Sequence, residues 1–200
     1  MLTIGITGGT GSGKTTALSV LAEMGAECFD CDEIYRALLE SSPQLKEELL
    51  AGFGDIGTDG GIDRKKLGAK VFNDPSALDE LNRIAHKHVI DEVDRLMEQS
   101  AAQGRDIAVI DAIALIESGI SERCDFTVFV HAPEEVRLRR IMRREGITED
   151  YAMMRIRAQK PDEFFKSRCD YVLDGAADMD DFRRLCGEFF EEKIEEYRRK

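Results

Sequence analysis

The stretch LTIGITGGTGSGKT, at residues 2–15, decides the fold class of this chain. Its first part, Leu2–Ile6, is a short apolar run closed by glycines, and Lys14–Met24 then has the apolar faces of a helix. Between them, the residues from Gly8 to Thr15 match the pattern G-x-x-x-x-G-K-[ST]. A strand, a glycine-rich loop and a helix in this order predict the phosphate-binding loop of an α/β nucleoside triphosphate-binding domain.

This loop supplies the first candidate site residues. Its glycines allow successive backbone N–H groups to surround phosphate oxygens, and the start of the helix adds the positive end of its dipole. We expect Lys14 to reach the β- and γ-phosphates and the Thr15 hydroxyl to bind Mg²⁺. The expected ATP-binding residues here are Gly8, Thr10, Gly11, Ser12, Gly13, Lys14, Thr15 and Thr16. The alternative is a glycine-rich turn that binds nothing, and the lack of a later N-K-x-D motif disfavours GTP.

Further apolar runs predict the rest of a parallel sheet. They are Glu27–Phe29, Ile107–Ile110, Phe126–Val130 and Tyr171–Leu173, and helical stretches separate them. We therefore expect a three-layer P-loop fold, with about five parallel strands and helices on both faces. No strand is predicted within residues 33–104. We interpret this segment as a helical insertion that binds a second substrate, the acceptor of a phosphoryl group. Residues 1–200 would form a single domain with this insertion.

Composition excludes several classes of protein. The 200 residues are 42% hydrophobic and 34% charged, which is typical of a soluble globular chain. No apolar stretch is long enough to span a bilayer and no export signal is seen, so we expect a cytoplasmic protein. The net charge of −12 argues against a nucleic-acid partner. Five scattered cysteines fit a reducing compartment; Cys28 and Cys31 form either a metal or redox pair or, more simply, two small apolar residues.

Three aspartates follow predicted strands: Asp30 and Asp32 after the second strand, and Asp111 after the run IAVI. In an open parallel sheet, ligands bind at the carboxyl ends of the strands. A carboxylate at this edge can accept a hydroxyl proton or hold Mg²⁺ through water. The alternative is a helix cap or turn residue, and for Asp32, which precedes a helical stretch, that alternative is serious.

An arginine-rich helix is predicted to begin at Pro133 or Glu134. The cluster comprises Arg137, Arg139, Arg140, Arg143 and Arg144. Residues 137, 140 and 144 share one helix face. We interpret the segment from about 133 to 168 as a mobile lid that brings positive charge to the phosphates and excludes water. The alternative is a solvated basic helix.

From about Ile4 to Leu173, the chain resembles the dephospho-coenzyme A kinases. The motifs that carry this resemblance, besides the phosphate loop, are Gly25-Ala26 with Asp30-Cys31-Asp32, Ile62-Asp63-Arg64 with Leu67, Leu81-Asn82-Arg83-Ile84 with His86, Arg140 with Arg144-Glu145-Gly146, and Arg155-Ile156 with Gln159. The chain departs from the family pattern at three places, which are Lys87 instead of proline, the altered run Asp111–Glu117, and Asp174-Gly175 instead of an asparagine.

The resemblance implies transfer of the γ-phosphoryl group of MgATP to the ribose 3′-hydroxyl of dephospho-coenzyme A. It implies that Lys14, Asp32 and Arg140 are catalytic and that Arg144 assists ATP binding from the lid. The acceptor would contact Asp32, Arg64, His86 and Asp111, and Asp111 would also serve Mg²⁺ through water. His86 is equally well interpreted as a structural histidine. We expect a monomer or small homo-oligomer; the rival functions are another small-molecule kinase and a nucleotide-dependent regulatory switch.

Overall fold

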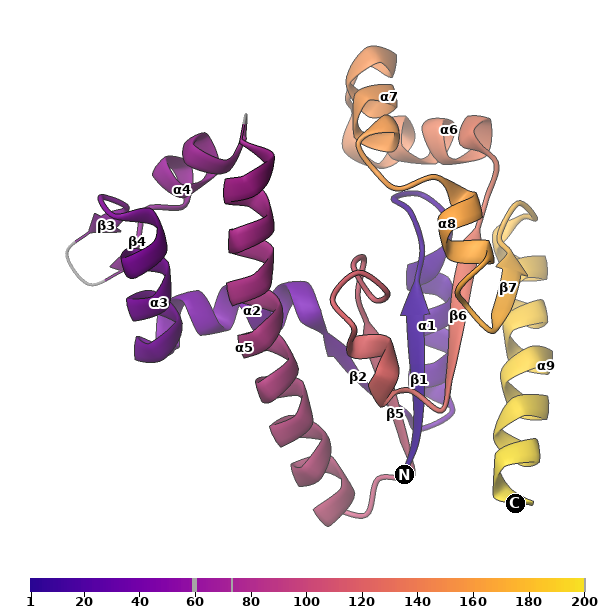
Figure 1. Cartoon of the computed structure of the whole chain (residues 1–200). Coiled ribbons are helices and arrows are strands. Elements are labelled where there is room, and N and C mark those ends of the chain that lie inside the picture. Colours follow the sequence, from indigo (N-terminus) through magenta and orange to yellow (C-terminus); the bar gives the residue numbers. More distant parts are fainter. Residues whose placement is uncertain (59–60, 73, 200) are drawn as a thin grey trace. The chain divides into compact units, whose positions relative to one another are not determined.

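The computed structural model describes residues 1–58, 61–72 and 74–199. The chain divides into two compact units. The sheet unit comprises Met1–Phe29 and Ser100–Lys200, and the helical unit comprises Asp30–Gln99 (Figure 1). No helix of the described residues is long and apolar enough to cross a membrane.

The sheet unit is built on five strands in the order β2-β5-β1-β6-β7. Their bounds are β1 Leu2–Thr7, β2 Glu27–Asp30, β5 Ile107–Asp111, β6 Phe126–His131 and β7 Tyr171–Asp174. β1 pairs in parallel with β5 on one side and β6 on the other, and β6 pairs in parallel with β7. The five predicted strands and the predicted fold class are confirmed.

Helices cover both faces of this sheet. On one face, alternate residues of β1 pack with α1 (Lys14–Glu23) and α9 (Met179–Arg198), which lie against each other (Figure 1). This apolar cluster includes Leu2, Ile4, Ile6, Ala17, Val20, Leu21, Phe182, Cys186, Phe190 and Ile194. On the other face, Phe129 of β6 stacks on Phe165 of α8 (Asp162–Lys166), with ring centroids 5.0 Å apart. Burial of alternate residues on both faces therefore fixes the strand register.

The arginine-rich segment is helical, as its sequence predicts. It forms α6 (Glu134–Glu145) and α7 (Glu149–Arg157), followed by α8. Ile141, Ala152 and Ile156 are buried between α6 and α7. A short 3₁₀ helix, Ile120–Arg123, precedes β6.

The helical unit contains α2 (Cys31–Ser41), α3 (Pro43–Phe53), α4 (Arg64–Val71) and most of α5 (Pro75–Ala102). Its apolar core is formed by Leu39, Leu45, Leu49, Phe53, Ile56, Leu67, Val71 and Ile84. The prediction that residues 33–104 contain no strand is wrong. β3 (Gly57–Thr58) and β4 (Gly61–Ile62) form an antiparallel pair. Strands of two residues are too short to produce an alternating pattern that sequence analysis can detect.

Candidate active site

The phosphate loop connects the carboxyl end of β1 to the first residue of α1. Gly11 and Gly13 have φ angles of 82° and 110°, in the left-handed region that a side chain disfavours. The backbone N–H of Ser12 donates to the Gly9 carbonyl at 3.0 Å, which closes the turn. Gly13 caps α1 without a side-chain hydrogen bond, so the first N–H groups of α1 have no side-chain acceptor there. This arrangement suits an anion.

Lys14 and Asp111 form an ion pair at this end of the sheet. Lys14 begins α1, while Asp111 ends β5 and lies opposite Ile6 of the neighbouring β1. Both side chains are largely buried, with 19% and 12% of their surface exposed. The carboxylate therefore holds the lysine ammonium beside the loop. Thr15, the next residue, is exposed, and Thr16 is half-buried.

Arg140 of α6 connects the phosphate loop to the segment after β7. Its Nη1 atom donates to the carbonyls of Gly11 and Ser12, both at 3.3 Å. Its Nη2 atom donates to the carbonyl of Ala177 at 2.9 Å. The structure thus places this guanidinium directly against the loop that the sequence predicts to bind phosphates.

Arg144 lies one turn further along α6 and is exposed. Its Nη2 atom pairs with Glu145 at 2.6 Å, and the same glutamate pairs with Arg155 of α7. The sequence places residues 137, 140 and 144 on one face, but their environments differ. Arg140 contacts the loop, whereas Arg144 belongs to the α6–α7 ion-pair cluster.

Arg137 and Gln159 are contacts of the loop that the sequence analysis did not include among the site residues. Arg137 is 6% exposed, and its Nε atom donates to the Thr10 carbonyl at 3.0 Å. Its Nη2 atom donates to Oε1 of Gln159, and Nη1 lies 3.8 Å from Asp162. Burial lowers the pKa of Arg137, and the charge of Asp162 opposes this.

A sequence signal for Arg137 exists. It lies four residues before Ile141, so the two share the face of α6 that is buried. An arginine in that register is expected to point inward rather than into solvent. Gln159 follows α7, and its only sequence signal is the motif that it forms with Arg155-Ile156; spacing does not reveal its partner Thr10, which is 149 residues away.

The remaining predicted site residues belong to the helical unit. Asp30 caps α2, since its Oδ1 atom accepts the backbone N–H groups of Asp32 at 2.8 Å and Glu33 at 3.0 Å. The carboxylate of Asp32 is therefore not needed as the cap, and it is exposed. Arg64 is exposed at the first residue of α4, and His86 is half-buried on α5 with an interaction partner.

Within the described parts of the chain, no group of three or more His, Cys, Asp or Glu side chains is arranged to hold a metal ion. All five cysteines, including Cys28 and Cys31, are free thiols. The oxygen atoms of Thr15 and Asp111 remain as ligands of the type that Mg²⁺ prefers when it keeps most of its water.

Comparison with known proteins identifies relatives along nearly the whole chain. The family model for dephospho-CoA kinase matches residues 2–181. The dephospho-CoA kinase of Geobacillus kaustophilus is 36% identical over 185 residues, covering 92% of each chain. That of Corynebacterium glutamicum is 35% identical over 183 residues, covering 90% of this chain and 92% of the relative.

Solved structures share the fold. The crystal structure of TT1252 from Thermus thermophilus has a TM-score of 0.76 at 32% identity and covers 96% of this chain and 97% of its own. A dephospho-CoA kinase from Campylobacter jejuni has a TM-score of 0.66 at 24% identity, covering 95% and 96%. A shikimate kinase from Bacteroides thetaiotaomicron has a TM-score of 0.58 at 17% identity, covering 97% and 98%. The last two are similar in fold alone.

Proposed function

This chain belongs to the dephospho-CoA kinase family and is an ATP-dependent kinase whose acceptor is dephospho-CoA, and we propose roles for its residues in that reaction. The γ-phosphoryl group of ATP passes to the ribose 3′-hydroxyl of the acceptor, which gives CoA and ADP. The observation that carries the proposal is the ion pair between Lys14 and Asp111 at the start of α1, beside Arg140.

Lys14 is proposed to exchange one anionic partner for another. In the structure its ammonium pairs with Asp111. When ATP occupies the loop, the ammonium turns to the β- and γ-phosphate oxygens, and the carboxylate of Asp111 becomes available. The Thr15 hydroxyl and, through water, Asp111 would hold Mg²⁺, which neutralises charge on the phosphate oxygens when bound. The transition state of phosphoryl transfer is loose, so positioning and charge stabilisation supply most of the acceleration.

Arg140 is proposed to stabilise the charge that develops on the transferred group. Its guanidinium already donates to backbone carbonyls of the phosphate loop, so a small rotation of the side chain redirects these N–H groups to a phosphate. Arg144 assists from the lid once α6 and α7 approach the nucleotide. This step requires a movement of the lid, since Arg144 pairs with Glu145 in the structure.

Asp32 is proposed to orient the acceptor hydroxyl. Because Asp30 fulfils the capping role on α2, the Asp32 carboxylate is available to accept a hydrogen bond from the ribose 3′-hydroxyl. A carboxylate is a weak base for an alcohol, so its main contribution is orientation, and the proton moves late. Asp111, Arg64 and His86 are proposed as further acceptor contacts.

The test is ADP release from MgATP with and without dephospho-CoA, with the product mass measured. We expect ADP only in the presence of the acceptor, and an acceptor product that is heavier by one phosphate. A panel of nucleosides, nucleotides and sugars serves as the comparison. Phosphorylation of another acceptor in preference to dephospho-CoA would contradict the proposal. Slow hydrolysis that is indifferent to every acceptor would favour a regulatory switch.

A further inference from the structure

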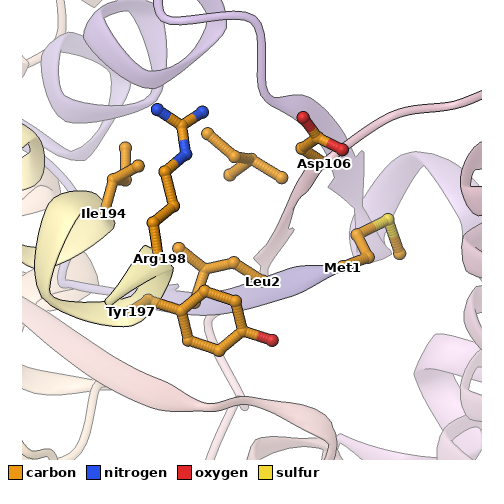
Figure 2. A pocket seen from close by; sticks show the side chains of 7 residues that line it. Met1, Leu2, Asp106, Ile194, Tyr197 and Arg198 are labelled. Carbon is orange, nitrogen blue, oxygen red and sulfur yellow. The ribbon is translucent and has the colours of Figure 1, made fainter. Parts of the chain in front are cut away.

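The helical unit contains a surface pocket of about 380 Å³ whose charge differs from that of the rest of the chain. Arg36 and Glu40 of α2, Lys46 of α3 and Arg64 of α4 line it, together with Leu39 and the two residues of β4. Three positive and one negative side chain give the pocket a formal charge of +2, in a protein whose net charge is −12. By contrast, a pocket of about 310 Å³ in the sheet unit is lined by one acidic and one basic side chain, Asp106 and Arg198, whose formal charges cancel (Figure 2).

The two arginines of this pocket differ from the other arginines of the helical unit in their partners. Arg83 and Arg95 on α5 are each bound by a glutamate three residues earlier, with Nη2 to carboxylate distances of 2.6 Å. Arg36 and Arg64 form no ion pair with any carboxylate of residues 1–58, 61–72 and 74–199. Two guanidinium groups therefore line one pocket, and neither is paired with its one carboxylate, Glu40. Each has the planar donor geometry that matches a phosphate oxygen pair.

The other two charged residues of the pocket, Glu40 and Lys46, are connected by a hydrogen bond. Nζ of Lys46 donates to the backbone carbonyl of Glu40 at 2.7 Å, which anchors the lysine at the pocket wall. Arg64 also lies near α2, because its charge opposes the burial that raises the pKa of Tyr35. The three cations, although they come from three helices, are thus held around one volume.

The position of Arg36 relative to Asp32 indicates which part of the acceptor the pocket would bind. The two residues are four apart on α2, so they share one face of the helix, about 6 Å apart along its axis. In dephospho-CoA the 3′-hydroxyl and the 5′-methylene that carries the diphosphate are on adjacent ribose carbons, C3′ and C4′, and project from opposite faces of the ring. A ribose whose 3′-hydroxyl meets Asp32 has its diphosphate within about one helical turn of that residue, so Arg36 on the same face of α2 lies within its reach.

We propose that Arg36, Lys46 and Arg64 form the subsite for the 5′-diphosphate of dephospho-CoA. This inference rests on the proposed function. The diphosphate diester carries one negative charge on each phosphate, which matches the formal charge of the pocket. Arg36 and Arg64 bind phosphate oxygens through paired N–H groups, and Lys46 adds a single ammonium. Glu40 adds a negative charge to the lining of the pocket. It therefore disfavours polyanions that carry more charge than the diphosphate.

The test compares Arg36→Met and Arg64→Met with Arg83→Met, a matched control on α5. Steady-state kinetics give KM for dephospho-CoA and for ATP separately, and calorimetry measures dephospho-CoA binding without ATP. Loss of a charge-assisted hydrogen-bond pair is expected to raise KM and Kd for dephospho-CoA by about 10- to 100-fold. KM for ATP is expected to change less than about twofold, and its retention shows that the variants are folded. Arg83→Met is expected to behave as wild type.

Two further measurements separate the possible outcomes. Arg36→Lys, which keeps the charge and loses the fork, is expected to give a KM between those of wild type and Arg36→Met. Equal KM values for dephospho-CoA in Arg36→Met, Arg64→Met and Arg83→Met would overturn the subsite while the proposed function stands. A wild-type protein that does not phosphorylate dephospho-CoA would overturn the function itself. A rise in KM for ATP equal to that for the acceptor would also overturn the subsite, because the loss would then be general.

Discussion

Gln159 holds Thr10 of the phosphate loop through both ends of its side-chain amide. The backbone N–H of Thr10 donates to Oε1 of Gln159 at 3.2 Å, and Nε2 of Gln159 donates to the Thr10 hydroxyl at 3.2 Å. Arg137 secures the same residue by donating to its carbonyl at 3.0 Å. The segment that follows α7 therefore fixes the tip of the loop, and any movement of that segment is coupled to the shape of the loop.

Replacing Gln159 with leucine removes both hydrogen bonds to Thr10 and also the acceptor of Arg137. Each neutral hydrogen bond contributes about 1 kcal/mol. We expect kcat/KM for ATP to fall about tenfold or more, which corresponds to at least ~1.4 kcal/mol. Steady-state kinetics with ATP as the varied substrate measure this. Gln103→Leu, at an exposed turn, is the control; equal kinetics in the two variants would show that the loop keeps its shape without Gln159.

Lys14→Ala separates the catalytic and structural roles of the ion pair with Asp111. The phosphates lose their ammonium partner, and loss of one preorganised donor typically costs 10²- to 10³-fold in turnover. We expect a decrease in kcat of at least ~10²-fold, measured as ADP release with dephospho-CoA present. Circular dichroism is expected to show an unchanged fold, because Lys14 is the first residue of α1 and is not part of the apolar core of the sheet unit. Turnover within about threefold of wild type would remove Lys14 from the proposed mechanism.

Asp32→Asn keeps the size of the side chain and removes its charge. The cap of α2 is formed by Asp30, so the helix is expected to remain intact. We expect ATP binding to be unchanged and kcat to fall by at least ~10²-fold, the lower end for a positioned acid–base group. Calorimetry with ATP and single-turnover phosphorylation of dephospho-CoA measure the two quantities. Asp30→Asn is the companion variant, since it alters the cap and leaves Asp32 in place.

The sequence predicts those parts of the molecule in which the signal is local. An apolar run predicts the strand Leu2–Thr7, a glycine-rich motif predicts the loop, and helical periodicity predicts α1. The structure has these elements at nearly the predicted bounds. The capping alternative for Asp32 could not be decided from the sequence, because Asp30 and Asp32 both precede the helical stretch that the sequence predicts, whereas α2 begins at Cys31. Only the backbone hydrogen bonds assign the cap to Asp30.

The contacts of Arg137 and Gln159 with Thr10 were beyond prediction for a related reason. Helical periodicity tells which face a residue shares, but it does not tell what lies opposite that face. Arg137 was therefore grouped with the arginines of a mobile lid, whereas it is buried against the loop. Long-range pairs of this kind depend on how α6 packs on the sheet.

Cys186 makes stability depend on pH in the alkaline range. It is fully buried on α9, and burial raises the pKa of its thiol to about 12. In the unfolded chain a thiol has a pKa of about 8.5, so the unfolded state loses its proton first as the pH rises. The contribution is complete below pH ~8.5 and is lost between there and pH ~12.

Cys186→Ala removes this titration at the expense of a small cavity. We expect the variant to be less stable than wild type at pH 7 and the difference to narrow by about 2 kcal/mol by pH 10, at ~1.4 kcal/mol per pH unit. Urea unfolding of both proteins at several pH values measures it. A constant difference between pH 7 and pH 10 would mean that the thiol titrates normally in the folded state.

Gly175 and Gly187 offer the same substitution in opposite environments. Gly175 follows β7; its N–H donates to the His131 carbonyl at 2.7 Å, and a Cβ there would overlap the carbonyl of Ser12 in the phosphate loop. Gly187 lies inside α9, and apart from its chain neighbours and the adjacent backbone of α9 no atom lies within 4 Å of a Cβ there. Gly175→Ala is therefore expected to displace the loop, and Gly187→Ala is expected to favour the helix.

The expected changes in the free energy of unfolding have opposite signs for the two variants. Overlap with backbone cannot be relieved by a side-chain rotation, so Gly175→Ala is expected to cost about 1–3 kcal/mol and to lower Tm by about 3–10 °C. Because the displaced atom belongs to Ser12, KM for ATP is expected to rise as well. Gly187→Ala is expected to add about 0.5–1 kcal/mol with unchanged kinetics. Thermal unfolding and ATP kinetics of both variants decide the matter: a Gly175→Ala protein with wild-type Tm and KM would mean that the segment after β7 does not support the phosphate loop.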